Sequence, residues 1–217
     1  MFSKELYKSA KEIWDSYYTH PFVRGIGEGS LEKDKFKFYI IQDYIYLLDY
    51  AKLFALGVIK SKNESDMKKF AALTDGILNS EMGIHRVYMK KLGITELDIA
   101  SEKPTLDNTS YTSYMLSVAH CGDIKEVAVA ALSCMWSYEM IGLKLKELYG
   151  SSDEFYGEWI ECYSSSRYKE LTNWNIELVE KYCQNISAEE KEHLKTIFIN
   201  CSIYEYKFWD MSYKGSF

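Results

Sequence analysis

The stretch DIKEVAVAALSCMWSYEMIGLKLKELY, from Asp123 to Tyr149, decides how this chain is expected to fold. Asp123 and Glu126 have the spacing of a capping box, in which two side chains bond each other's backbone N–H groups at the start of a helix. No proline interrupts the long apolar stretch that follows. The pattern therefore predicts one long helix over residues 124–149.

Similar signals predict helices along the rest of the chain. The only prolines, Pro21 and Pro104, are expected in loops, so long helices are permitted almost everywhere else. Helices are expected over about residues 3–18, 30–59, 63–92, 111–120, 152–183 and 188–212.

Several polar residues and glycines mark the expected helix ends. Ser30 and either Asn63 or Ser65 are expected to start helices, and Gly93 to end one. The pairs Ser151/Glu154 and Ser187/Glu190 have capping-box spacing. Residues 20–29, with Gly25, Gly27 and Gly29, are expected to form a loop, and Ser164–Ser166 to bend the helix over 152–183.

The organisation of the chain indicates a single unit. No segment alternates like a strand, no repeat is visible, and no linker divides the sequence. We therefore expect one all-α domain over residues 1–217, with about seven or eight helices.

Composition narrows the classes of partner. A formal net charge of −6 argues against nucleic acid, and the absence of a polybasic run argues against a membrane surface. The most apolar stretch, residues 40–59, is interrupted by charged residues, and the N-terminus lacks a secretory apolar region. Five scattered cysteines without a C-x-x-C pair are typical of reduced thiols, so we expect a cytoplasmic protein.

Three reactive groups stand among aromatic residues. Cys134, in CMWSY, could be a core thiol or a nucleophile facing a flat ring. Asp43, in IQDYIY, and Glu205, in YEYKFW, would be costly to bury unless something pairs with them. Each of the three residues alone is compatible with a structural role, but together they suggest a site.

Helical spacing places each reactive group beside aromatic or other apolar residues. Residues three or four apart share a helix face. The neighbours on these faces are Tyr39 and Tyr46 for Asp43, Ala131 and Tyr138 for Cys134, and Cys201, Phe208 and Trp209 for Glu205.

The order of these motifs carries a family resemblance. The motifs are His20-Pro21-Phe22-Val23-x-Gly25-Ile26-Gly27, Gln42-Asp43-x-x-Tyr46, Tyr111-Thr112-Ser113-Tyr114-Met115, Cys134-x-Trp136-x-Tyr138 and Tyr204-Glu205-Tyr206-x-Phe208-Trp209. Arranged in this way, the whole chain closely resembles the TenA family of thiaminase II, or aminopyrimidine aminohydrolase.

The resemblance implies a heme-oxygenase-like helical bundle, usually a homotetramer, that needs no cofactor. It implies hydrolysis of the bond between a 4-amino-2-methylpyrimidine 5-methylene group and its leaving group. That group is ammonia in 4-amino-5-aminomethyl-2-methylpyrimidine and the thiazole in thiamin; the product, hydroxymethylpyrimidine, returns to thiamin synthesis. Sequence alone does not rank the two substrates.

By motif match, Cys134 is the expected nucleophile, Glu205 the acid/base group and Asp43 the pyrimidine anchor. The expected pocket residues are Tyr46, Tyr111, Tyr138, Tyr163 and Phe208, although the serines after Tyr163 depart from the Gly-rich pattern of the family. Aromatic surroundings should raise the pKa of Glu205 toward neutrality, which suits an acid/base group.

Two other functions remain open from the residues alone. Glu81 and His85 lie one helical turn apart and could ligate iron in a di-iron oxidase of the same fold, but too few ligands accompany them, so no metal site is expected. A structural hydrogen bond or an intersubunit contact is the simpler role for this pair. The aromatic pocket would also suit a regulatory protein that binds the pyrimidine without turning it over.

Overall fold

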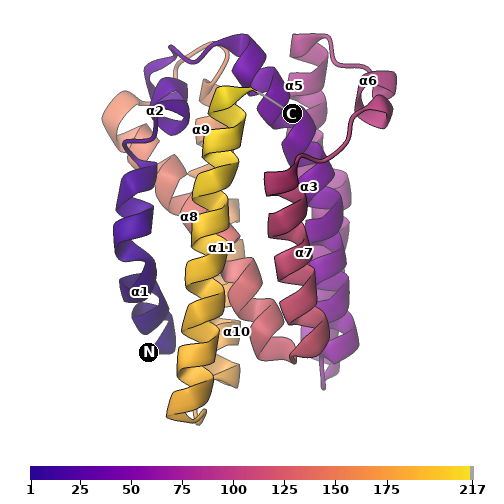
Figure 1. The fold of residues 1–217 in the computed structure, drawn as a ribbon, viewed down its shortest axis with the longest axis vertical. Helices are drawn as coiled ribbons and strands as arrows, with labels where there is room; N and C mark the ends of the chain where they lie inside the picture. The colour runs from indigo at the N-terminus through magenta and orange to yellow at the C-terminus, as the bar shows by residue number, and fades with distance from the viewer. Residues whose placement is uncertain (216–217) are drawn as a thin grey trace.

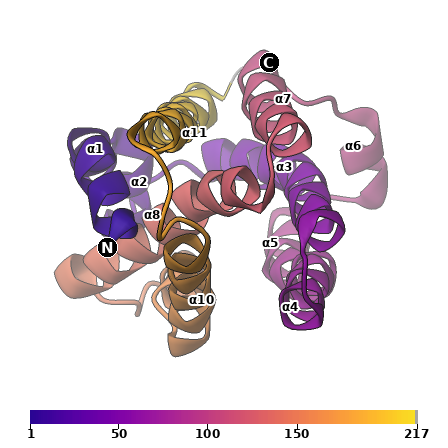
Figure 2. The ribbon, with the colours of Figure 1, turned by 90° about the horizontal axis from the view of Figure 1, so that it is seen from below.

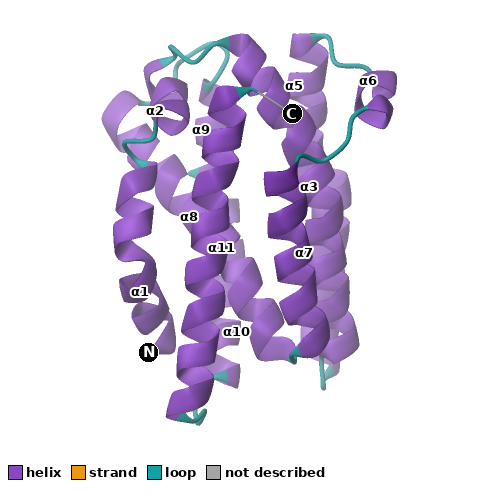
Figure 3. Cartoon of the chain, viewed as in Figure 1, coloured by secondary structure: helices purple, strands orange, loops and turns teal. Residues whose placement is uncertain are grey.

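The chain folds into helices joined by loops (Figure 3). The computed structural model describes residues 1–215 and, for residues 80–82, only the backbone. Within this part there are eleven α-helices and one π-helical segment, η1, and no strand. They are α1 (Phe2–Tyr17), α2 (Pro21–Glu28), α3 (Lys33–Lys60), α4 (Glu64–Gly76), η1 (Ile77–Glu81), α5 (Met82–Leu92), α6 (Glu96–Ser101), α7 (Leu106–Cys121), α8 (Ile124–Tyr149), α9 (Gly157–Tyr163), α10 (Ser166–Tyr182) and α11 (Ala188–Lys214). The all-α class is confirmed, whereas the predicted number of helices is too small.

Helix α8 lies at the centre of the bundle, with the other long helices around it (Figure 2). It packs against α3, α7, α10 and α11, and α1, α3, α7 and α11 run side by side along the long axis (Figure 1). Every side chain from Val127 to Leu132 is fully buried, as expected for a helix that is apolar all round. The predicted capping box is confirmed, since the backbone N–H of Asp123 donates to Glu126 at 2.7 Å.

The predicted loop over residues 20–29 is wrong, because this segment forms α2. Pro21 occupies the first turn, where its fixed φ suits a helix, and Nδ1 of His20 accepts from the backbone N–H of Phe22 at 3.1 Å. Gly29 ends the helix with φ +68°. The burial of Phe22 and Ile26 outweighs the poor helix propensity of the glycines.

The region predicted as one helix over residues 63–92 is divided. Asn63 caps α4 by accepting from the backbone N–H of Asp66 at 3.0 Å, as expected. The π-helical segment η1 then separates α4 from α5, and Gly93 follows α5 with φ +66°. Segments of π-helix have an extra residue per turn and occur frequently at functional sites.

Three other predicted helix starts are wrong. Glu32, rather than Ser30, precedes α3 and makes no side-chain capping bond. Helix α7 begins at Leu106, ahead of the expected Tyr111, because Thr105 caps it. The pair Ser151/Glu154 does not open a helix, since residues 151–156 form turns and α9 begins at Gly157.

In the C-terminal third of the chain, the helix boundaries agree with the predicted bend and capping box. The predicted bend at Ser164–Ser166 is a break between α9 and α10, where Ser165 caps α10 by accepting from the backbone N–H of Tyr168 at 3.2 Å. The capping box of Ser187 and Glu190 opens α11 as predicted. Among the described residues, no helix combines the length and apolar character needed to cross a membrane.

Candidate active site

A small pocket lies where α3, α8, α9 and α10 meet. Its volume is ≈ 10 Å³, room for about one water molecule. The lining residues are Asp43, Tyr46, Leu47, Tyr50, Cys134, Tyr138, Tyr163 and Tyr168. The fold therefore gathers five of the sequence-predicted site residues, from three helices, around one space; we call it the reacting pocket.

Two helix faces supply most of this lining. On α3, Asp43, Tyr46 and Tyr50 have i, i+3, i+7 spacing, which keeps them on one face. On α8, Cys134 and Tyr138 are one turn apart and both are buried. Long helices thus hold the thiol and one carboxyl group on rigid backbone.

Asp43 has a buried histidine as its partner. Nε2 of His85, on α5, lies 2.6 Å from Oδ2 of Asp43, and both side chains are at most 5% exposed. An N–H donor at this distance fixes the orientation of the carboxylate. This hydrogen bond joins α5 to α3. The Glu81 side chain lies outside the described residues.

Glu205 is buried beside neutral donors. The Tyr111 hydroxyl donates to its Oε2 at 3.0 Å. Burial raises the pKa of Glu205 to about 8; the charge of Asp43 adds to the rise, and hydrogen bonds from Tyr111, Tyr138 and Cys134 oppose it. This direction agrees with the expectation from its aromatic surroundings, and Glu205 is mostly protonated at neutral pH.

The thiol and the two carboxyl groups are close enough to interact. Asp43 and Cys134 line the same pocket, and both influence the pKa of Glu205: the charge of Asp43 raises it, and Cys134, as a hydrogen-bonding neighbour, lowers it. Each of the three comes from a different helix: α3, α8 or α11. A buried thiol, a protonated carboxyl group and a carboxyl group bonded to an imidazole therefore share one small region.

The tyrosines around these groups are neutral hydrogen-bond donors. Burial raises the pKa values of Tyr46, Tyr111 and Tyr138 well above the ordinary value. Tyr46 also packs against Tyr111 and Phe208, with ring centroids 5.2 and 5.7 Å away. Tyr111 and Phe208, both predicted as pocket residues, thus lie behind the lining, where they support Tyr46 and Glu205.

Tyr163 reaches the pocket through a close contact between α9 and α8. A Cβ atom at Gly142 would lie 2.7 Å from the carbonyl carbon of Tyr163, so only glycine at this position of α8 lets the two backbones approach. The Tyr163 ring then packs 4.8 Å from that of Tyr138. The glycine that makes room for Tyr163 is therefore Gly142 of α8, and not one of the residues that follow Tyr163 in the sequence.

Sequence reasoning did not assign four residues to the site. Tyr50 and Leu47 continue the face of α3 that carries Asp43 and Tyr46, so their spacing could have identified them. Tyr168 and His85 come from helices whose placement beside the pocket has no local sequence signal.

Comparison with known proteins places the chain in a family. The fold and the candidate site define a class of protein: a helical bundle with a thiol and two carboxyl groups buried in its interior. Residues 7–215 match the TENA/THI-4/PQQC family, and the chain belongs to it. The resemblance to TenA proteins is confirmed.

Individual relatives agree with this assignment. The chain is 50% identical to the aminopyrimidine aminohydrolase of Helicobacter pylori, over 98% of this chain and 99% of that protein. A TenA homologue from P. horikoshii OT3 superposes with a TM-score of 0.91 at 29% identity, covering 100% of both chains. A domain with a heme oxygenase-like fold from Shewanella denitrificans, at 17% identity, has a TM-score of 0.74 over 97% of this chain and 91% of that one. The last likeness shows the fold alone.

Proposed function

We propose that this chain is an aminopyrimidine aminohydrolase that releases hydroxymethylpyrimidine from 4-amino-5-aminomethyl-2-methylpyrimidine, from thiamin, or from both. Family membership and the named activity of the Helicobacter pylori relative support the reaction class. The observation that carries the proposal is that Asp43 and Cys134 line one small pocket, with the buried Glu205 near enough for both to influence its pKa. A protein that only bound a pyrimidine would need neither a thiol nor a protonated carboxyl group at this place.

Asp43 is the proposed anchor for the pyrimidine. Its carboxylate accepts from the exocyclic amine and from a protonated ring nitrogen, which fixes the ring and makes it a better electrophile. His85 holds one carboxylate oxygen. The lining tyrosines supply flat apolar faces for the ring.

Cys134 is the proposed nucleophile in the first half of the reaction. Its sulfur forms a bond to the unsubstituted ring carbon next to the one that bears the methylene group, and the thiol proton passes to the ring nitrogen bonded to that carbon, which is not the nitrogen held by Asp43. The bond from the 5-methylene carbon to the leaving group then breaks. The leaving group takes the bonding electrons and the proton of Glu205, which leaves an exocyclic alkene and a Glu205 carboxylate.

Water completes the reaction through the same two groups. It attacks the methylene carbon and returns a proton to Glu205. The carbon–sulfur bond then breaks, and the ring-nitrogen proton returns to the thiol. The overall reaction is R–CH₂–X plus H₂O giving R–CH₂–OH plus HX, where R is the aminopyrimidine ring and X is the leaving group. The pKa of about 8 at Glu205 matches this order, because the group starts protonated and acts first as an acid.

One assay tests the proposed activity. The purified protein is incubated separately with the aminomethylpyrimidine and with thiamin, and hydroxymethylpyrimidine is quantified by chromatography. Release from at least one substrate, in proportion to protein concentration, is expected. Tight binding of the pyrimidine without release would contradict catalysis and support the binding-protein alternative. The homotetramer expected from the family resemblance is checked by light scattering on the same sample.

A further inference from the structure

Tyr39 is a fully buried tyrosine on α3 that the proposed reaction does not use. It lies one helical turn before Asp43, so the two side chains share a face of the helix. The Tyr39 ring packs among Phe22, Phe36 and Trp209, with ring centroids 5.2, 5.5 and 5.8 Å away. These aromatic contacts hold the Tyr39 hydroxyl group in a fixed position.

The Tyr39 hydroxyl has Trp159 of α9 as a hydrogen-bond partner. Nε1 of Trp159 donates to the hydroxyl oxygen at 3.3 Å, and both residues are at most 1% exposed. The Trp159 backbone is held in turn, because its N–H donates to the Tyr88 hydroxyl at 3.0 Å. An indole N–H can only donate, so it occupies one acceptor position of the phenol oxygen. The phenol proton of Tyr39 remains available for a different acceptor.

Asp43 offers this proton a charged acceptor. A hydrogen bond to an ionised carboxyl group is stronger than one to a neutral hydroxyl. Burial raises the pKa of Tyr39 well above its ordinary value, and Asp43 adds to the rise through its charge and as a hydrogen-bonding neighbour. Trp159 and Tyr138, as hydrogen-bonding neighbours, lower it. These directions are the ones expected when the phenol donates to Asp43 and accepts from the other two side chains.

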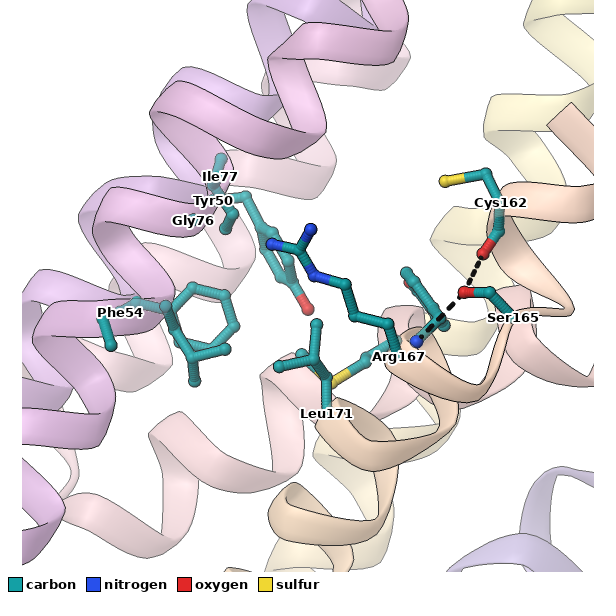
Figure 4. A pocket seen from close by; sticks show the side chains of 12 residues that line it. Tyr50, Phe54, Gly76, Ile77, Cys162, Ser165, Arg167 and Leu171 are labelled. Atoms are coloured by element: carbon teal, nitrogen blue, oxygen red, sulfur yellow. Dashed lines mark hydrogen bonds between the residues drawn. The ribbon is translucent and has the colours of Figure 1, made fainter. Parts of the chain in front are cut away.

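Tyr39 and Trp159 lie outside the open spaces of the site. The described residues that line the reacting pocket include Asp43 but neither Tyr39 nor Trp159. These two residues are also not among the described residues that line the larger cavity of ≈ 180 Å³ between α4 and α10, which include Cys162 and Arg167 (Figure 4). The Tyr39 hydroxyl therefore affects a ring in the reacting pocket only through a residue of the lining.

We propose that Tyr39 and Trp159 are a positioning pair for the ring anchor. Trp159 orients the Tyr39 hydroxyl, and this hydroxyl gives Asp43 a second donor in addition to His85. A carboxylate with one donor can still rotate about that hydrogen bond, whereas a second donor fixes its plane toward the pyrimidine. The inference rests on the proposed function, because it concerns the group that holds the ring in that reaction.

A double-mutant cycle tests the link from Tyr39 to Asp43. Tyr39→Phe removes the hydroxyl and keeps the ring. Kd for hydroxymethylpyrimidine, measured by isothermal titration calorimetry, should rise about fivefold, the factor that corresponds to one hydrogen bond, while kcat stays within about twofold. In an Asp43→Ala background, where the acceptor is gone, the same change should alter Kd by less than about twofold.

Tyr156→Phe is the matched control for loss of a buried hydroxyl. The Tyr156 hydroxyl donates to the backbone carbonyl of Leu31 at 2.6 Å, and its ring, like that of Tyr39, packs against Phe36. Kd should therefore stay at the wild-type value in this variant. Melting temperatures verify that each variant is folded.

Trp159→Phe tests the second link, because it removes the N–H that orients the Tyr39 hydroxyl. Kd should rise about threefold in the wild-type background and should not rise further when Tyr39→Phe is already present. If Tyr39→Phe does not fold, Trp159→Phe with and without Asp43→Ala provides the same cycle, with the same expected loss of effect.

An unchanged Kd in folded Tyr39→Phe, or an equal rise with and without the Asp43 carboxyl group, would overturn the positioning pair. Additive effects of Trp159→Phe and Tyr39→Phe would also overturn it, since Trp159 would then act by another route. These outcomes leave the proposed function standing. Failure of the wild type to release hydroxymethylpyrimidine from either substrate would instead refute the proposed function itself.

Discussion

The two buried carboxyl groups of the site differ in their partners. Asp43 faces the imidazole of His85, a group that can carry a positive charge. Glu205 faces the phenol of Tyr111, which burial keeps neutral, and its pKa is raised to about 8. The proposed function depends on this difference, because it uses Asp43 as a carboxylate that holds the ring and Glu205 as a carboxylic acid that gives up a proton.

Removing the proton of Glu205 should have the largest effect. Glu205→Gln keeps the shape and a hydrogen-bonding group but cannot donate a proton as an acid, so kcat should fall by about a thousandfold, within the usual range for acid/base groups. In the wild type, kcat/KM should decline as pH rises above about 8, where Glu205 ionises. Steady-state rates from pH 6 to pH 10 measure both effects. A variant with wild-type turnover would place the acid elsewhere.

Removing the charge of Asp43 should mainly weaken binding. Asp43→Asn loses a charge-assisted hydrogen bond to the pyrimidine worth about 2 kcal/mol, so Kd for hydroxymethylpyrimidine should rise about thirtyfold. Isothermal titration calorimetry measures this change. Asp210→Asn is the matched control, because Asp210 lies 3.4 Å from Nε2 of His20 in another Asp–His pair. An unchanged Kd in Asp43→Asn would show that a different group anchors the ring.

The raised pKa of Glu205 also predicts a pH dependence of stability. Between its ordinary value of 4.5 and about 8, the folded protein retains a proton that the unfolded chain releases. The free energy of unfolding attributable to this group should therefore fall by about 1.4 kcal/mol per pH unit as pH rises.

Urea titrations of the wild type and Glu205→Gln at pH 5.5, 6.5 and 7.5 isolate this contribution, since other titrating groups cancel in the difference. Glu205→Gln should gain stability relative to the wild type as pH rises across the series. Parallel curves for the two proteins would contradict a raised pKa at Glu205.

The smallest expected effect concerns the partner of Asp43. His85→Phe removes one hydrogen bond that orients the carboxylate, so KM should rise about fivefold with little change in kcat. His85→Gln, which restores an N–H donor, should return KM to within about twofold of the wild type. If both variants lower kcat and leave KM unchanged, His85 acts in the chemical step and does not position Asp43.

The helices could be predicted where side chains mark their ends. Asp123 and Ser187 begin capping boxes, and both open helices as expected. The sequence predicts a loop for the segment of Gly25 and Gly27, whereas burial of Phe22 and Ile26 makes it helical despite the poor helix propensity of glycine. Nothing local in the sequence indicated the π-helical segment that divides α4 from α5.

The site was predictable only where its residues share one helix. Asp43 and Tyr46 reveal a face of α3 by their spacing, and Tyr50 continues it. The family resemblance, and not spacing, joined Asp43 to Cys134 and Glu205. The contact of His85 with Asp43 depends on how α5 packs against α3. The spacing of residues along one helix does not predict which other helix packs against it.

The central claim is that Asp43, Cys134 and Glu205 act on one small molecule, with Cys134 as the attacking group. The most direct test is Cys134→Ser, assayed for turnover and for hydroxymethylpyrimidine binding in the same preparation. We predict that kcat falls by at least about a hundredfold while Kd stays within about threefold, as expected when a covalent nucleophile is lost from an intact pocket. Near-normal turnover by Cys134→Ser would contradict the account.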